Sequence, residues 1–415
     1  MGVAEVRKGY AKDTGPAYGW AALILFALSW LAPLFELKPN RIASGRMARL
    51  WEIWPLAAGV ALAMAALAAT LAYKLRADRQ ASTKPAPGWA GLCSEHRAPF
   101  FVRGAALGSA LGLFAGPALL LAQQAPGPTL PRVSPGAGFW LLLSAAFLAY
   151  RWTKPARETV PAFRGFWPLA FSLGLLALAL TGLLDRFSPY MEFRAQGQRF
   201  WAELARHISL AGSSFLVALL AGTAGAVALS RSSLLGRLLS AAASAIQNVP
   251  SLALFGLLLP VMAALADAFP WLRSIGISGI GAAPAFLALT AYAILPIMLS
   301  GAAGLRMVDS GAKDTARGMG MGRLQLLARV ELPLALPSLA AGARTALVQT
   351  IGTTTIAALI GAGGMGYFVF QGVGQAAMDM VIIGVIPIAL LSFAADKGMA
   401  MLERALSRKA DRPWP

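Results

Sequence analysis

Ten long apolar stretches follow one another along the chain, with polar segments between them. A helix needs roughly 20 mostly apolar residues to cross a bilayer, and most of these stretches approach that length. This pattern predicts an all-α polytopic membrane protein with about ten transmembrane helices. The stretches are Tyr18–Phe35, Trp54–Tyr73, Gly104–Ala122, Gly138–Tyr150, Phe166–Leu184, Ile208–Ser230, Ala245–Ala266, Ala283–Leu305, Leu336–Ile360 and Met380–Met401.

A polar segment after the fifth stretch divides the ten into two sets of five. We therefore expect an accessory N-terminal transmembrane region over 1–206, a five-helix core over 207–406 and a cytoplasmic tail over 407–415. Arg7, Lys8 and Lys12 precede the first stretch, as in a signal peptide. That stretch is long for a signal peptide, and no clear small-residue cleavage site follows it, which favours a retained first helix.

The composition agrees with a membrane protein, because 57% of residues are hydrophobic and only 13% are charged. Soluble domains carry about 25% charged residues. The net charge of +18 would suggest nucleic acid in a soluble domain. Here the basic residues gather in alternate inter-helix segments, which marks those segments as cytoplasmic, and no aromatic residues are interleaved with them. We expect both termini inside, no nucleic-acid partner, and a location in the bacterial plasma (inner) membrane as a multi-pass protein.

The loop Glu36–Ile53 is the weak point of this orientation. It holds Lys38, Arg41, Arg46 and Arg49, yet alternation places it outside. If this loop lay inside, one of the first five predicted membrane-spanning helices would not cross the membrane, and the predictions for the second half of the chain would be unchanged.

No set of residues in the sequence predicts enzymatic chemistry or a bound metal. Cys93 is the single cysteine, and with His96 it supplies at most two metal ligands. His96 and His207 lie in or beside loops, where we expect solvated side chains. Gly361, Gly363 and Gly366 spell a dinucleotide-type pattern, but they follow an apolar helix, so we expect a helix cap and a re-entrant turn. The chain has no phosphate-binding loop of the GxxxxGK[ST] type, so ATP would have to be used by a partner.

The most informative polar segment is the predicted cytoplasmic loop over 306–338. Its central part mixes apolar and charged residues at helical spacing, which predicts short surface helices ended by Pro333. The spacing resembles the EAA motif of ABC importer permeases, in which Glu-Ala-Ala, a glycine, an Ile and Leu-Pro stand at fixed intervals. Two positions depart mildly, Asp for Glu and Thr for Ala. The matching residues are Asp314, Thr315, Ala316, Gly320, Val330, Leu332 and Pro333.

Other segments are similar to osmoprotectant permeases of this family. Gln247–Gly256 and Ala357–Gly366 resemble signatures in the transport core. Pro39–Gly45 and Leu50–Pro55 resemble the extended branch with extra N-terminal helices. The resemblance implies a type I ABC importer permease (MetI-like) core that imports glycine betaine or a related quaternary ammonium osmoprotectant. It also implies ABC ATPase subunits that bind ATP-Mg and dock on the EAA loop, a solute-binding protein, and a second permease copy or homologous permease.

Polar residues inside the core helices are candidates for the transport pathway. They would either line it or be satisfied by helix–helix hydrogen bonds. Arg344, deep in the ninth stretch, is a candidate for binding a solute carboxylate, whereas Asp396 and Lys397 favour local pairing. The remaining candidates are Gln247, Asn248, Pro250, Ser251, Gln349, Thr353, Thr354 and Thr355.

Two alternatives remain at this level. The loop motif indicates an ATP-driven importer but does not specify its cargo, so another small solute such as an amino acid is possible. A membrane-embedded sensor or enzyme is the alternative from a different class. An enzyme would need convergent titratable groups within the helices, and a sensor would work without an ATPase partner.

Overall fold

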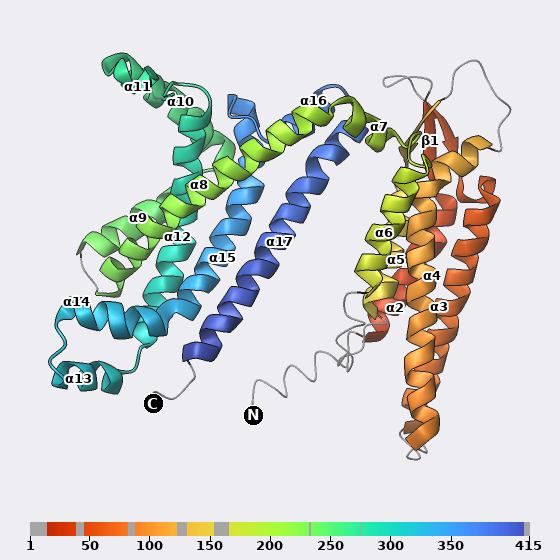
Figure 1. The fold of residues 1–415 in the computed structure, drawn as a ribbon, viewed down its shortest axis with the longest axis horizontal. Helices are drawn as coiled ribbons and strands as arrows, with labels where there is room; N and C mark the ends of the chain where they lie inside the picture. Colours follow the sequence, from red (N-terminus) through yellow and green to blue (C-terminus); the bar gives the residue numbers. More distant parts are fainter. Residues whose placement is uncertain are drawn as a thin grey trace. The chain divides into compact units, whose positions relative to one another are not determined.

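The computed structural model describes residues 15–38, 45–81, 88–122, 131–152, 166–231, 234–274 and 276–410. The chain divides into two units, Met1–Arg194 and Ala195–Pro415. Figure 1 draws the helices of both units. The sequence places this boundary at residue 206, and the structure divides the chain after Arg194, before a long helix that belongs wholly to the second unit.

The first unit is a bundle of five long helices. α5 packs on α2 and on α4, while α3 and α6 also contact α4. Its core is apolar and rich in aromatic rings, with Phe26, Phe35 and Phe139 almost fully buried. The helices are α2 (Gly15–Leu31), α3 (Trp54–Ala81), α4 (Gly88–Ala122), α5 (Ala137–Trp152) and α6 (Phe166–Leu180), with the short η1 (Leu50–Glu52) and α7 (Ser188–Ala195).

A small antiparallel sheet closes one end of this unit, and the sequence analysis did not predict it. β1 (Phe35–Lys38) lies between β2 (Arg46–Ala48) and β3 (Arg132–Pro135). Val133 also bridges to Phe187, in the segment after α6. Strands of three or four residues are too short to show a clear alternating pattern. The sheet brings the segments after α2, α4 and α6 to the same end of the unit. Helices that cross a membrane in alternating directions require this arrangement. The sheet therefore supports placing the loop Glu36–Ile53 on the same side of the membrane as the segments after α4 and α6.

The second unit is built around α12 (Ala282–Met307). α8 (Gly197–Ser230), α9 (Leu234–Asn248), α10 (Ser251–Ala268) and α15 (Leu332–Ala357) pack on it, and α17 (Met378–Ala410) packs on α15. The short helices of this unit are α11 (Trp271–Ser274), α13 (Ser310–Gly318), α14 (Arg323–Leu326), η3 (Leu327–Glu331), η4 (Ala358–Ile360) and α16 (Gly366–Gly374).

Small residues let these helices approach closely, as is common in membrane bundles. At Gly342 in α15, a Cβ atom would lie 2.6 Å from the carbonyl oxygen of Pro296 in α12. At Gly301 in α12, it would lie 2.8 Å from the Cβ atom of Ala226 in α8. Both distances are shorter than van der Waals contact, so the α12 crossings depend on glycine.

The prediction of an all-α fold is confirmed, with one correction to the seventh predicted stretch. By length and composition, six helices in the described part of the chain could cross a membrane, and four shorter apolar helices accompany them. The predicted stretch Ala245–Ala266 is not one helix. α9 ends at Asn248, and α10 begins at Ser251 after Pro250. Proline lacks an N–H group, so it starts a helix more readily than it continues one.

Candidate functional site

The EAA-like segment forms a short helix, α13, at the end of the second unit where α12 ends (Figure 1). The carboxylate of Asp309 caps its start by accepting a 3.1 Å hydrogen bond from the backbone N–H of Ala312. Asp314 is in the middle of α13. Asp314 and Thr315 are exposed, and Asp314 pairs with Arg317 at 3.0 Å.

Gly320 ends α13 in a left-handed conformation, with φ of +82°. The N–H of Gly320 donates to the carbonyl of Arg317, and the N–H of Met321 donates to the carbonyl of Ala316. This pair of bonds is the Schellman arrangement that closes helix C-termini. A side chain would meet no atom within 4 Å here, so the backbone conformation is what requires glycine.

Pro333 does not end the surface helix, contrary to the sequence prediction. α14, the π-helical η3 and α15 follow without a break from Arg323 to Ala357. The N–H of Leu332 donates to the carbonyl of Leu327, five residues back. This π-type turn comes immediately before Pro333, whose missing N–H would interrupt a regular α-helix at this point. The loop is therefore joined to the membrane helix by continuous helical backbone.

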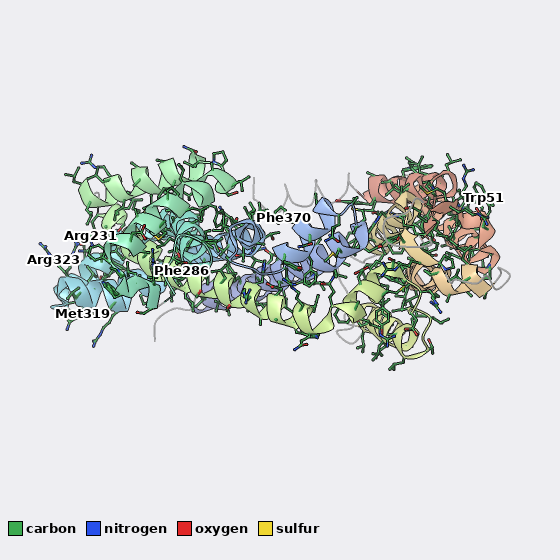
Figure 2. The ribbon with its side chains drawn as sticks, turned by 90° about the horizontal axis from the view of Figure 1, so that it is seen from above. Trp51, Arg231, Phe286, Met319, Arg323 and Phe370 are labelled. Carbon is green, nitrogen blue, oxygen red and sulfur yellow. The ribbon has the colours of Figure 1, made fainter. Side chains whose placement is uncertain are left out.

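The outer face of this loop is apolar with basic residues beside it. Met319 is 67% exposed and Leu324 is 81% exposed. Arg317 and Arg323 are exposed as well. Figure 2 shows Met319 and Arg323 at the edge of the second unit, in the same region as Arg231. We call Asp314, Arg317, Met319, Arg323 and Leu324 the loop surface. Exposed apolar side chains grouped with charges are typical of a protein-binding surface.

The inner face fixes the loop to the helices of the core. Ala316 is buried, and Leu332 packs against Ala226, Ala302 and Leu305. Arg231, just after α8, lies 3.7 Å from Glu331. Val330 is half-buried and Pro333 is exposed.

Basic side chains also hold helix ends at the loop. Arg306 donates to the carbonyl of Leu229 at 2.7 Å, and the ammonium group of Lys313 donates to the carbonyl of Leu305 at 3.4 Å. Cations are favourable at helix C-termini, where carbonyls lack helical partners. These contacts join α13 to the end of α12, and α12 to the end of α8.

Gln247 is a helix–helix contact at the break between α9 and α10. Its amide donates at 2.9 Å to the carbonyl of Tyr292 in α12. In a regular helix that carbonyl would accept from residue 296, but Pro296 has no N–H. In return, the hydroxyl of Tyr292 donates at 2.5 Å to the carbonyl of Val249. The pair satisfies the carbonyl of Tyr292, which Pro296 leaves without a helical donor, and the carbonyl of Val249 between the two helices.

The other pathway candidates divide into exposed and internal positions. Asn248 and Pro250 are exposed, and Ser251 and Gln349 are half-exposed. The hydroxyls of Thr353 and Thr354 donate to the carbonyls of Gln349 and Thr350 within α15. Thr354 is fully buried, while Thr353 and Thr355 are half-buried. Asn248 and Pro250 are therefore the candidates accessible on the surface of one subunit.

Arg344 is held by carboxylates of the chain itself. Its Nε donates to Oδ1 of Asp396 at 2.7 Å, and Nη1 lies 3.5 Å from a carboxylate oxygen of Glu403. Lys397 lies 3.7 Å from Asp396. Arg344 therefore joins α15 to α17, and the local pairing expected for Asp396 is present. The contact of Arg344 with a solute carboxylate stays a prediction.

Sequence reasoning missed two buried titratable residues near the start of α8. Glu203 accepts a 2.7 Å hydrogen bond from the N–H of Gly364, and Nδ1 of His207 lies 3.3 Å from the N–H of Met365. Nε2 of His207 lies 3.1 Å from the carbonyl of Ile351. His207 has no exposed surface, so the prediction of a solvated histidine is wrong. Two ionisable residues four apart at the start of an apolar helix were the available signal.

The side chains of Glu203 and His207 contact the backbone of the glycine-rich turn that resembles a dinucleotide motif. Gly361 caps the short η4 with φ of +80°, and α16 follows from Gly366. No strand precedes the turn within the second unit as described, and the expected helix cap is confirmed. In the same described part of the chain, no group of three His, Cys, Asp or Glu residues could hold a metal. The side chains of Cys93 and His96, and residues 39–44, lie outside the described set.

Comparisons with known proteins cover both units. Residues 214–408 match the binding-protein-dependent transport system inner membrane component. Residues 17–190 match the ABC transporter permease YehY, N-terminal domain. A carnitine transport permease protein of Listeria monocytogenes is 30% identical over 220 residues, which are 53% of this chain and 94% of that protein. The chain belongs to the family of binding-protein-dependent inner membrane permeases.

Other members and a solved structure are also similar to this permease. A glycine betaine/carnitine/choline transport system permease protein of Bacillus subtilis is 34% identical over 49% of this chain and 83% of that protein. The inward-facing MetNI methionine ABC transporter is 22% identical, over 51% of this chain and 98% of that chain, with a TM-score of 0.43. As a member of this family, the chain is a multi-pass membrane permease of an ABC importer.

Proposed function

We propose that this permease is the transmembrane subunit of an ATP-driven importer for glycine betaine or a related quaternary ammonium osmoprotectant. The observation that carries the proposal is the loop surface with its EAA spacing, in a chain whose relatives are named for carnitine, choline and glycine betaine. These three solutes share a trimethylammonium group. Its cation would be recognised mainly by an aromatic cage in the solute-binding protein.

ATP-Mg would be bound by ABC ATPase subunits, and the permease itself would bind no cofactor. The exposed apolar side chains of the loop surface fit a groove on such a subunit, in the manner of a helix-in-groove contact. Closure of the ATPase pair would push α13. The continuous helix from Arg323 would pass that movement to α15, where Gln349 and Thr353 lie.

The proposed orientation follows from the same contact. The end that carries α13 would face the cytoplasm, because ATP is hydrolysed there, and both termini would lie on that side. A second permease copy or a homologous permease would complete the pathway at the subunit interface. The exposure of Asn248 in one subunit supports this arrangement.

Uptake by cells that lack their own osmoprotectant importers tests the proposal. The chain would be expressed with its ATPase and binding-protein partners, and uptake of labelled glycine betaine, choline, carnitine and methionine would be compared. We expect ATP-dependent uptake of at least one quaternary ammonium solute and none of methionine. Uptake of an amino acid alone would favour the second candidate, an importer of another small solute.

A further inference from the structure

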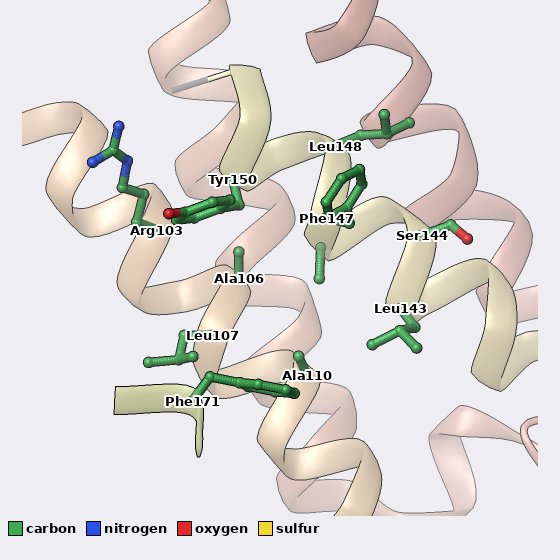
Figure 3. A pocket seen from close by; sticks show the side chains of 11 residues that line it. Arg103, Ala106, Leu107, Ala110, Leu143, Ser144, Phe147, Leu148, Tyr150 and Phe171 are labelled. Carbon is green, nitrogen blue, oxygen red and sulfur yellow. The ribbon is translucent and has the colours of Figure 1, made fainter. Parts of the chain in front are cut away.

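An apolar cavity lies within the first unit. It has a volume of 630 Å³, within the roughly 300–1,000 Å³ typical of ligand pockets. Side chains of α4, α5 and α6 line it, and Figure 3 shows them around the cavity. Among them are Leu107 and Ala110 of α4, Leu143 and Phe147 of α5, and Phe171 of α6.

One end of this cavity is chemically different from the rest. Among the lining residues that the structure describes, Arg103 of α4 is the charged one, and it is 7% exposed. Its guanidinium carbon lies 5.5 Å from the ring centre of Tyr150, at the end of α5. Figure 3 shows these two side chains together at one end, with Phe171 and Ala110 further along. The cavity therefore has a cationic end and an apolar body.

The membrane position of this cationic end follows from the helix directions. The predicted apolar stretch Gly104–Ala122 begins directly after Arg103, so the sequence places Arg103 at the membrane boundary. The basic segments Lys74–Arg103 and Arg151–Gly165 adjoin this end in sequence, and the positive-inside bias assigns them to the cytoplasmic face. From Arg103 to Ala110 the helix rises about 10 Å, roughly a third of the hydrocarbon thickness.

We propose that this cavity binds one anionic phospholipid of the cytoplasmic leaflet, with its phosphate at Arg103 and an acyl chain along Leu107, Ala110 and Phe147. The apolar lining matches an acyl chain, and the buried guanidinium matches a phosphate, which arginine binds well. A phospholipid is the amphiphile present at this depth in every bilayer. This site is independent of the transport pathway proposed above.

Native mass spectrometry of the detergent-purified full chain tests the site. The chain is equilibrated with equal amounts of phosphatidylglycerol and phosphatidylcholine. We expect the wild-type chain to retain phosphatidylglycerol roughly fivefold better, the preference expected for one basic contact. Arg103→Gln should lose the preference, Arg103→Lys should keep most of it, and Ala110→Trp should lower retention of both lipids. Arg151→Gln is the matched control, since Arg151 is exposed and does not line the cavity.

A photoreactive phosphatidylglycerol locates the lipid in the unmodified chain, so the test does not depend on how the variants fold. Crosslinked peptides from α4 near Ala106 and from α5 near Phe147 are expected. Equal retention of both lipids by the wild-type chain, an unchanged preference in Arg103→Gln, or crosslinks confined to other helices would each overturn the proposal.

Discussion

At the residue scale, one backbone conformation sets the shape of the loop surface. Gly320 has φ of +82°, which costs other residues about 1 kcal/mol or more. The two backbone hydrogen bonds of this turn, donated by Gly320 and Met321, fix where Met319 and the following helix point. The side chains that would meet an ATPase subunit therefore depend on a residue that need not touch it.

The variant Gly320→Ala tests this dependence. We expect weaker binding of the ATPase subunit, by about fivefold if the strain of about 1 kcal/mol is released by distorting the loop. Gly318→Ala is the control, because Gly318 ends α13 without the left-handed conformation and has no atom within 4 Å of an added Cβ. Binding would be measured by titration of the purified ATPase in detergent. Equal affinity of both variants would contradict this role of Gly320.

Neighbouring residues at the α9–α10 break should behave differently. Gln247→Leu leaves the carbonyl of Tyr292 without its donor, at a cost of about 1–3 kcal/mol, so we expect a lower unfolding temperature. Asn248→Leu changes an exposed residue, so we expect normal assembly and reduced uptake. Thermal unfolding and uptake would be measured for both. Normal uptake by Asn248→Leu would remove Asn248 from the pathway.

At the element scale, the pairing of α15 with α17 is a structural contact. Arg344 is about one-third exposed and bonded to Asp396, so removing either partner leaves a charge in the membrane region. We expect Arg344→Met to lower the unfolding temperature without a selective rise in the KM for solute. The exchanged pair Arg344→Asp with Asp396→Arg should recover part of the loss.

Lys397→Met is the control for that pair, because Lys397 lies 3.7 Å from Asp396 and is about half exposed. It should change the unfolding temperature much less. A raised KM at normal stability in Arg344→Met would instead return Arg344 to a solute-binding role.

Elements differ in how well the sequence predicts them. Long apolar runs predicted the helices, because membrane insertion depends on a summed property of about 20 residues. The sequence analysis gave Ala245–Ala266 as one stretch, although the helix breaks at Pro250, and it ended the surface helix at Pro333, where the structure has a π-type turn. The effect of a proline is hard to predict because it can end a helix, begin one or be accommodated by a local rearrangement. A helix begins after Pro250, whereas helical backbone continues through Pro333.

The candidate site was predictable only where chemistry follows local spacing. The loop motif could be found because its residues stand at fixed, short intervals in the sequence. The partners of Arg344 and His207 lie more than 50 and 140 residues away, so no local pattern reveals them. For the same reason, the sequence could not distinguish lining of the pathway from helix–helix bonding at Gln247.

At the scale of the whole molecule, the two units contain different features. The second unit holds the loop surface, the core helices and the pathway candidates. The first unit has its own apolar core, a sheet across one end and a cavity with one buried arginine. The central claim is that the second unit works only with an ATPase subunit, and this follows from its EAA spacing and its family.

The most direct test purifies the tagged chain from its native membrane and identifies co-purifying proteins by mass spectrometry. The native chain is compared with the double variant Asp314→Lys, Gly320→Trp, and with Asp267→Lys, an exposed acid at the end of α10. The account predicts an ABC ATPase with the native chain and with Asp267→Lys, and its loss from the double variant. The absence of any ATPase from the native chain would contradict the account.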